Sequence, residues 1–221
     1  MPPSNAAEWF DRMDRAVRSS AALAVPLRAS FRAREIDIGN MEGSVHLAPG
    51  GRMDYRLKGS LPMLGQGRFE IRVVSDGHTL AAEGLPSRRV STPEGLTDSI
   101  QAMVSHVGFS FVRIASGWGS DPPAVDPRRT VRLEGLTLGP ADLVHGRMAQ
   151  SVRYTQTFVE EHWGKEMGAL DVVVWIDAET FLPLKKIFRG QGAEGVTVEE
   201  EYEGIESGGP VDPARFELPA R

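Results

Sequence analysis

The side chains best suited to metal binding or acid–base catalysis are five histidines, and the sequence scatters them. None lies in an H-E-x-x-H motif, and no two have the spacing of paired metal ligands. The chain has no cysteine, which excludes disulfides and thiolate metal sites. The sequence therefore predicts neither a metal site nor a cofactor. The histidines are His46, His78, His106, His145 and His162.

The sequence also gives no support for a catalytic nucleophile or a phosphate-binding loop. Ser110 lies in G-F-S-F and not in the G-x-S-x-G turn of hydrolases, and neither G-x-G-x-x-G nor a Walker A loop occurs. Residues 160–162 (EEH) and 199–201 (EEE) could hold acid–base pairs, but such charge runs are more often solvated faces or turns. The sequence therefore predicts a protein that is not an enzyme, although a fold can bring distant residues together.

Composition limits the class of protein. The chain has 221 residues, of which 41% are hydrophobic, so we expect one domain over residues 1–221. The net charge of −5 argues against nucleic acid as a partner. No apolar run approaches the roughly 20 residues of a membrane span. The first ten residues lack the pattern of an export signal, so the protein is either cytoplasmic or exported by a signal outside these residues.

Two segments alternate strictly between apolar and charged residues, at 52–58 and 68–73. This period of two predicts antiparallel strands with one dry and one wet face. We expect the apolar set on a concave face and the charged set on a convex face. The apolar set is Met53, Tyr55, Leu57, Phe69, Ile71 and Val73. The charged set is Arg52, Asp54, Arg56, Lys58, Arg68, Glu70 and Arg72.

Helical spacing appears in two places. Ser4 and Asn5 can cap an N-terminal helix, and Ser91 with Glu94 outlines a capping box that opens an insert over residues 91–125. The insert is broken at Gly108 and is more apolar than a solvent-exposed connection, so we expect it to cover the sheet as a lid. The residues expected to face the sheet are Leu96, Ile100, Met103, Val107, Phe109 and Phe111.

Residues 171–188 read DVVVWIDAETFLPLKKIF and predict a hairpin whose first strand is apolar on both faces. Val172, Val174 and Ile176 share one face of this strand, and Val173 and Trp175 share the other. The side chain of Asp177 is expected to form hydrogen bonds within its own turn, as is that of Thr180. We therefore expect Asp177 to have a structural role.

Four stretches resemble the LolA/LolB lipoprotein-carrier superfamily. Residues 74–80 (VSDGHTL) resemble its v-s-D-G-k-t-L hairpin, and residues 43–49 (GSVHLAP) resemble its G-x-l-x-l-k-x-P strand and turn. Residues 175–185 resemble its W-i-D-x-x-T-x-l-P-x-k hairpin, and residues 211–219 its C-terminal v-d-p-x-x-F-x-l-p. The matches occur in the family's order and span about residues 8–219. Ala48 stands where the carrier often has a basic residue, which leaves the cargo open.

The resemblance implies an α+β fold, mainly β with helices. It is a curved antiparallel half-barrel sheet with an N-terminal helix and a helical lid insert on the concave side. It implies a non-enzymatic carrier of the bacterial periplasm or cell envelope that holds acyl chains of a lipid or lipoprotein. A membrane-bound donor or acceptor protein is a further expected partner. The alternative is an envelope protein-interaction or sensor module whose concavity is filled by its own side chains.

In the carrier interpretation, a set of apolar residues lines the ligand cavity. These residues are Met53, Tyr55, Leu57, Phe69, Ile71, Val73, Met103, Val107, Phe109, Phe111 and Val174.

Overall fold

The computed structural model describes residues 3–34, 36–62, 66–84, 88–108, 131–158, 168–190 and 195–219. The first half contributes strands β1 (Leu23–Ala33), β2 (Ile36–Ala48), β3 (Arg52–Leu61), β4 (Gln66–Asp76), β5 (Thr79–Glu83) and β6 (Arg88–Ser91). The second half contributes β7 (Val131–Val144), β8 (Arg147–Phe158), β9 (Ala169–Asp177), β10 (Pro183–Gly190), β11 (Val196–Glu201) and β12 (Glu206–Ser207). The helices are α1 (Ala6–Arg18), α2 (Leu96–Ala102), the π-helix η2 (Met103–Val107) and the 3₁₀ helix η4 (Pro213–Phe216).

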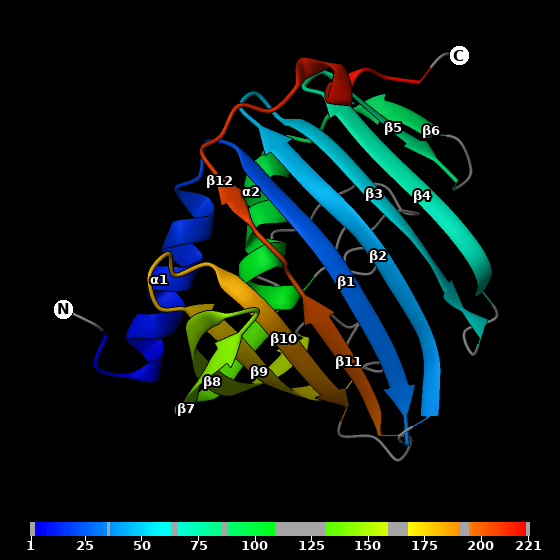
Figure 1. Cartoon of the computed structure of the whole chain (residues 1–221). Helices are drawn as coiled ribbons and strands as arrows, with labels where there is room; N and C mark the ends of the chain where they lie inside the picture. The colour runs from blue at the N-terminus through cyan, green and yellow to red at the C-terminus, as the bar shows by residue number, and fades with distance from the viewer. Residues whose placement is uncertain are drawn as a thin grey trace.

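These strands form one antiparallel sheet in the order β6-β5-β4-β3-β2-β1-β11-β10-β9-β8-β7, and β12 pairs with β1. The order ends at β6 and β7, so the described sheet is an open curve (Figure 1). α2 lies on the inner side of this curve, and α1 packs beside it. The predicted half-barrel with an N-terminal helix is confirmed.

The concave face carries the apolar side chains of the predicted alternation. Met53, Tyr55 and Leu57 on β3 and Ile71 and Val73 on β4 are all buried. They belong to one core together with α1, α2 and η2, and the partly buried Phe69 packs against that core. The period of two in the sequence therefore identified the inner face of the sheet correctly.

One residue of the predicted wet face departs from the pattern. Asp54 lies on the convex side between Met53 and Tyr55, but its exposed fraction is 0%. The reason is the C-terminal segment, which crosses the convex face and places η4 against β3 and β4. The prediction that Asp54 is solvated is therefore wrong, because sequence alternation does not show which segment returns to cover a face.

The described part of the predicted lid insert consists of α2 and η2. The proposed capping box is wrong, because Ser91 is the last residue of β6 and the helix follows Gly95, which has φ +73° and makes no side-chain cap. The break predicted at Gly108 is confirmed, because this residue ends η2 with φ +94°. Residues 109–125, including Phe109 and Phe111, lie outside the described residues, so the extent of the insert stays a prediction.

The hairpin of β9 and β10 is apolar on both faces, as its sequence predicted. Val172, Val174 and Ile176 are buried in the main core. On the other face, Trp175 packs on a small second core formed by Val144, Ala149 and Leu184. In the turn, Asp177 accepts hydrogen bonds from the backbone N–H groups of Glu179 and Thr180, each at 2.8 Å. The structural role predicted for Asp177 is confirmed.

Candidate functional site

The inner side of the sheet is the candidate site, and the α2–η2 segment lies inside it. Met103 and Val107 on η2 and Val174 on β9 are buried in the same core as the predicted β3 and β4 residues. Nearly every side chain of the segment from Ile100 to Val107 is buried, with His106 as the partly exposed exception. A helix buried all round in this way fills the space between α1 and the sheet.

A buried pair of opposite charges lies on the concave face. Lys186 on β10 and Glu200 on β11 are directly opposite each other in the strand register, and both have an exposed fraction of 0%. The Nζ of Lys186 donates to the backbone carbonyls of Val104, at 2.6 Å, and Ser105, at 2.9 Å. A lysine ammonium at a helix C-terminus stabilises the carbonyls that have no partner within the helix. Lys186 thus joins the end of the helical segment to the sheet.

The buried position changes the titration of Lys186. Burial lowers its pKa from 10.5 to about 8, because an ammonium loses hydration in the core. The carboxylates of Glu200 and Asp14 act in the opposite direction and favour the charged form. The group therefore titrates close to the physiological range while it holds the helix end.

The three tyrosines of the chain surround Glu200. Tyr202 donates a hydrogen bond from its hydroxyl to the Glu200 carboxylate. Burial, and next the negative charge of Glu200, raise the pKa of Tyr55, Tyr154 and Tyr202 above the ordinary value of a phenol. Gly108 lies against the same carboxylate, because a Cβ added to it would be 3.0 Å from Oε2 of Glu200. The centre of the concave side is therefore polar and closely packed.

The sequence interpretation missed this polar centre. The run at residues 199–201 was interpreted as a solvated face or a turn, which is wrong for Glu200. A signal was present in the sequence. Glu200 shares its strand parity with Val198 and Tyr202, and Lys186 shares its parity with Phe188, so opposite charges stand at core positions of two neighbouring strands.

Polar contacts also tie α2–η2 to α1. Ser105 Oγ donates to Asp14 Oδ1 at 2.8 Å and lies 2.9 Å from His106 Nδ1. Gln101 Nε2 donates to the backbone carbonyl of Ser20 at 2.9 Å. His106 Nδ1 is also 3.5 Å from Asp14 Oδ1. This is not a catalytic triad, because the serine and the carboxylate meet the same imidazole nitrogen and Ser105 is fully buried.

Two polar side chains on β8 face the core without a partner among the described residues. The hydroxyl of Tyr154 and both polar atoms of the Gln156 amide are buried and make no hydrogen bond there. Because buried polar groups are nearly always paired, each exception calls for an explanation.

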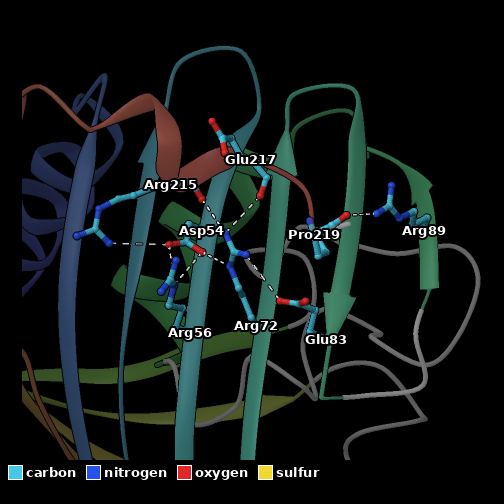
Figure 2. Close-up of polar contacts among 8 residues, drawn as sticks. All are labelled: Asp54, Arg56, Arg72, Glu83, Arg89, Arg215, Glu217 and Pro219. Atoms are coloured by element: carbon cyan, nitrogen blue, oxygen red, sulfur yellow. Dashed lines mark hydrogen bonds and ion pairs between the residues drawn. The ribbon is translucent and has the colours of Figure 1, made fainter. Parts of the chain in front are cut away.

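On the convex side, a cluster of arginines around Asp54 holds the C-terminal segment (Figure 2). Asp54 accepts from Arg56 Nε at 2.9 Å and from Arg72 Nε at 3.0 Å, and Arg215 Nη1 lies 3.9 Å away. Arg72 Nη2 also donates to the carbonyls of Arg215, at 3.0 Å, and Glu217, at 3.3 Å. We call Asp54, Arg56, Arg72 and Arg215 the C-terminal clasp. Its contacts are structural, since Asp54 and Arg72 bind the side chain and carbonyls of the returning C-terminal segment.

Two open grooves of about 710 and 910 Å³ run over the convex face beside this clasp. Charged side chains of both signs line them, among them Arg28, Glu42, Lys58 and Glu70. They are unlike the apolar inner face and offer a polar surface to a partner.

Among the described residues, one group has a composition suited to a metal ion. Donor atoms of His145, Glu201 and Glu203 lie within 4.8 Å of one another. Glu203 already pairs with Arg28 at 3.3 Å, and an exposed acidic group alone does not define a site. Within the described chain, no helix has the length and apolar character needed to cross a membrane.

Comparison with known proteins reveals similarity at the level of structure. No family model and no curated protein matches the sequence. LprF from Mycobacterium bovis is 14% identical, with 100% of this chain and 99% of LprF covered and a TM-score of 0.55. The lipoprotein LppX of Mycobacterium tuberculosis is 10% identical, with 94% and 97% covered and a TM-score of 0.50. At such identities the likeness concerns the fold alone, and the chain has a LolA-like fold.

Proposed function

We propose that the protein is a non-enzymatic carrier of the bacterial cell envelope that binds acyl chains of a lipid or lipoprotein. The observation that supports this function is the apolar concave face, which helices cover in place of a second sheet. Each methylene group that leaves water contributes about 0.8 kcal/mol, so an inner face of this kind favours long alkyl chains. A membrane-bound protein is the proposed donor or acceptor.

The binding surface in this proposal is the set predicted from the sequence. Its described members are Met53, Tyr55, Leu57, Phe69, Ile71, Val73, Met103, Val107 and Val174. Because α2–η2 occupies the concave side, an acyl chain can lie between the sheet residues of this set and the η2 residues Met103 and Val107 only when the segment moves outward. Polar contacts hold the segment at its C-terminal end, through Lys186. Gly108, at φ +94°, is a suitable joint.

A pair of matched double variants tests this mechanism. Lys186→Met with Glu200→Gln removes both buried charges and releases the helix end. We expect faster uptake of a fluorescent fatty-acid probe. Replacing two buried opposite charges together by apolar or neutral groups is often tolerated, so the variant should fold. The control is Lys185→Met with Glu199→Gln, a contacting lysine–glutamate pair of the same two strands on the opposite face. It should leave uptake unchanged.

Native mass spectrometry of protein purified from a cell envelope, followed by lipid extraction, tests the function itself. We expect co-purified acyl chains. Their absence from several preparations, together with no uptake of the probe by any variant, would contradict the carrier function.

The filled concavity favours a second candidate, a protein-interaction or sensor module. In that case α2–η2 is permanent core and a partner binds the charged grooves of the convex face. A photo-crosslinking residue in place of Lys58, which lines both grooves, should then capture a defined envelope protein. A crosslinking residue at the exposed Glu179, outside both grooves, is the control.

A further inference from the structure

The unpaired polar groups of Gln156 and Tyr154 lie on one strand and one face. They are two residues apart on β8, so both side chains point to the concave side. Gln156 has an exposed fraction of 0%, and its amide nitrogen and oxygen make no hydrogen bond to the described residues. The buried hydroxyl of Tyr154 also makes no hydrogen bond to the described residues. Three unpaired polar atoms, both donors and acceptors, therefore lie on the concave face of β8 on side chains two residues apart.

The described neighbours of Gln156 do not supply partners. In the register, Gln156 is opposite Leu133 on β7 and Leu170 on β9, and Phe158 follows it on the same face. The ring of Phe10 meets the Tyr154 ring edge-on, with the centroids 5.5 Å apart. A buried donor or acceptor without a partner destabilises a protein, whereas an apolar side chain at this position would not. The polar atoms of Gln156 and Tyr154 are therefore suited to pair with a polar group of a bound ligand.

We propose that Gln156 and Tyr154 bind the linkage group of a neutral acyl lipid, a carbonyl with a hydrogen-bond donor beside it. This inference rests on the proposed function. The amide N–H of Gln156 and the hydroxyl of Tyr154 donate to the carbonyl, and the amide oxygen of Gln156 accepts from the hydroxyl or N–H of the lipid. A monoacylglycerol has both groups next to its alkyl chain, and its chain then lies along the apolar side chains around Gln156.

The surrounding charge disfavours an ionised ligand at the same place. The carboxylate of Glu200 is close enough to Tyr154 to act, after burial, on the pKa of its phenol. Lys186 already faces Glu200 across the strand register, so a fatty-acid carboxylate bound to the Tyr154 hydroxyl would bring a second negative charge into this buried region for the same ammonium. A neutral ester with a free hydroxyl avoids this repulsion.

Three probes with the same alkyl chain test the proposal: monooleoylglycerol, methyl oleate and oleate. The natural protein should bind monooleoylglycerol about tenfold more tightly than methyl oleate, because the free hydroxyl adds hydrogen bonds to buried groups. Oleate should bind more weakly than monooleoylglycerol. Gln156→Leu and Tyr154→Phe should each reduce the preference for monooleoylglycerol. Thr155→Val, a change on the opposite face of the same strand, should preserve it.

Melting temperature gives a second, independent readout. Gln156→Leu should raise the melting temperature of the lipid-free protein, because it removes an unpaired buried amide. A lower melting temperature would mean that the amide has a partner in the protein and would overturn the inference.

The binding outcomes separate this inference from the proposed function. Equal affinity of the natural protein for monooleoylglycerol and methyl oleate overturns the inference and leaves the carrier function intact. Binding of none of the three probes overturns both. If a bound water alone bridges Gln156 and Tyr154, Gln156→Leu will not change the preference, and the inference is wrong.

Discussion

Lys186 and Glu200 show how much a single residue can depart from the pattern of its strand. Each stands at a position where its strand otherwise turns apolar side chains inward. Two opposite charges buried across a strand register are weak evidence for stability, because desolvation opposes their attraction. Its contacts with the helix end suggest another role. The ammonium supplies the hydrogen bonds that the last carbonyls of η2 lack.

The titration of Lys186 should be visible in the pH dependence of stability. Between its folded pKa of about 8 and its ordinary pKa of 10.5, the unfolded chain holds a proton that the folded protein has released. Stability rises with pH wherever the unfolded state binds more protons. The free energy of unfolding should thus increase above about pH 8, by up to about 1.4 kcal/mol per pH unit.

Urea denaturation between about pH 7 and 9.5 measures this increase, below the range in which tyrosines of the unfolded chain ionise. The rise should be absent in Lys186→Met and present in Lys185→Met, its neighbour on the other face. An equal rise in both variants would show that another group is responsible.

The second residue-scale prediction concerns Asp54 in the C-terminal clasp. Asp54→Asn removes the buried carboxylate charge that the partly exposed guanidinium groups of Arg56 and Arg72 contact, so we expect a loss of about 2 kcal/mol in the free energy of unfolding. Limited proteolysis should also cut the C-terminal segment more readily. Glu42→Gln, which removes an exposed ion pair with Lys58, is the matched control and should be nearly neutral. Identical behaviour of the two variants would contradict the clasp.

At the scale of elements, β2 and β3 approach each other closely where glycines replace larger residues. A Cβ added to Gly59 would lie 2.3 Å from the Asn40 carbonyl oxygen, and one added to Gly43 would lie 2.0 Å from the Arg56 carbonyl oxygen. Both contacts are with backbone, which cannot rotate away as a side chain can. These glycines therefore allow the close pairing of these two neighbouring strands.

Replacing glycine by alanine should consequently change the stability of the protein in opposite directions at Gly59 on β3 and at Gly67 on β4. Gly59→Ala forces β2 and β3 apart and should destabilise the protein by about 1–3 kcal/mol. Gly67→Ala on β4 meets nothing within 4 Å, and it should stabilise slightly because it reduces the freedom of the unfolded chain. Thermal unfolding of the two variants measures both effects. Equal destabilisation of the two variants would mean that the close approach of β2 and β3 does not cause the loss of stability in Gly59→Ala.

Periodicity made parts of this architecture predictable. The alternation in β3 and β4 requires only local information, since neighbouring side chains of a strand point to opposite faces. The helix start at Leu96 was not predicted, because the capping-box residue Ser91 pairs with Thr79 across the sheet instead. Pairing between strands decides such cases, and local propensity does not.

At the scale of the whole molecule, α2–η2 and a bound acyl chain would compete for the same space on the concave side of the sheet. If acyl chains bind there, the segment must move away from the sheet. Monooleoylglycerol should therefore increase amide hydrogen exchange in residues 96–107, while exchange in β3 and β4 stays slow. Hydrogen exchange read by mass spectrometry can locate the change. Unaltered exchange of residues 96–107 in the lipid complex would show that the segment is permanent core.

Part of the candidate site could be predicted from the sequence. Its apolar wall follows from strand periodicity and from the resemblance to lipoprotein carriers. Its polar centre does not, because Lys186 and Glu200 meet only through the pairing of β10 with β11 and α2–η2 reaches them from a distant part of the sequence. A contact between segments so far apart has no signature in either segment alone.

The gathering of all three tyrosines around Glu200 gives the protein an optical signal for the opening of its interior. A phenolate absorbs at longer wavelength than a phenol, and the closed protein should show almost no phenolate at a pH where free tyrosine is half ionised. Outward movement of α2–η2 would hydrate the rings and let them ionise. An absorbance change at about pH 10, the ordinary pKa of a phenol, could then follow opening in real time, with no dye attached.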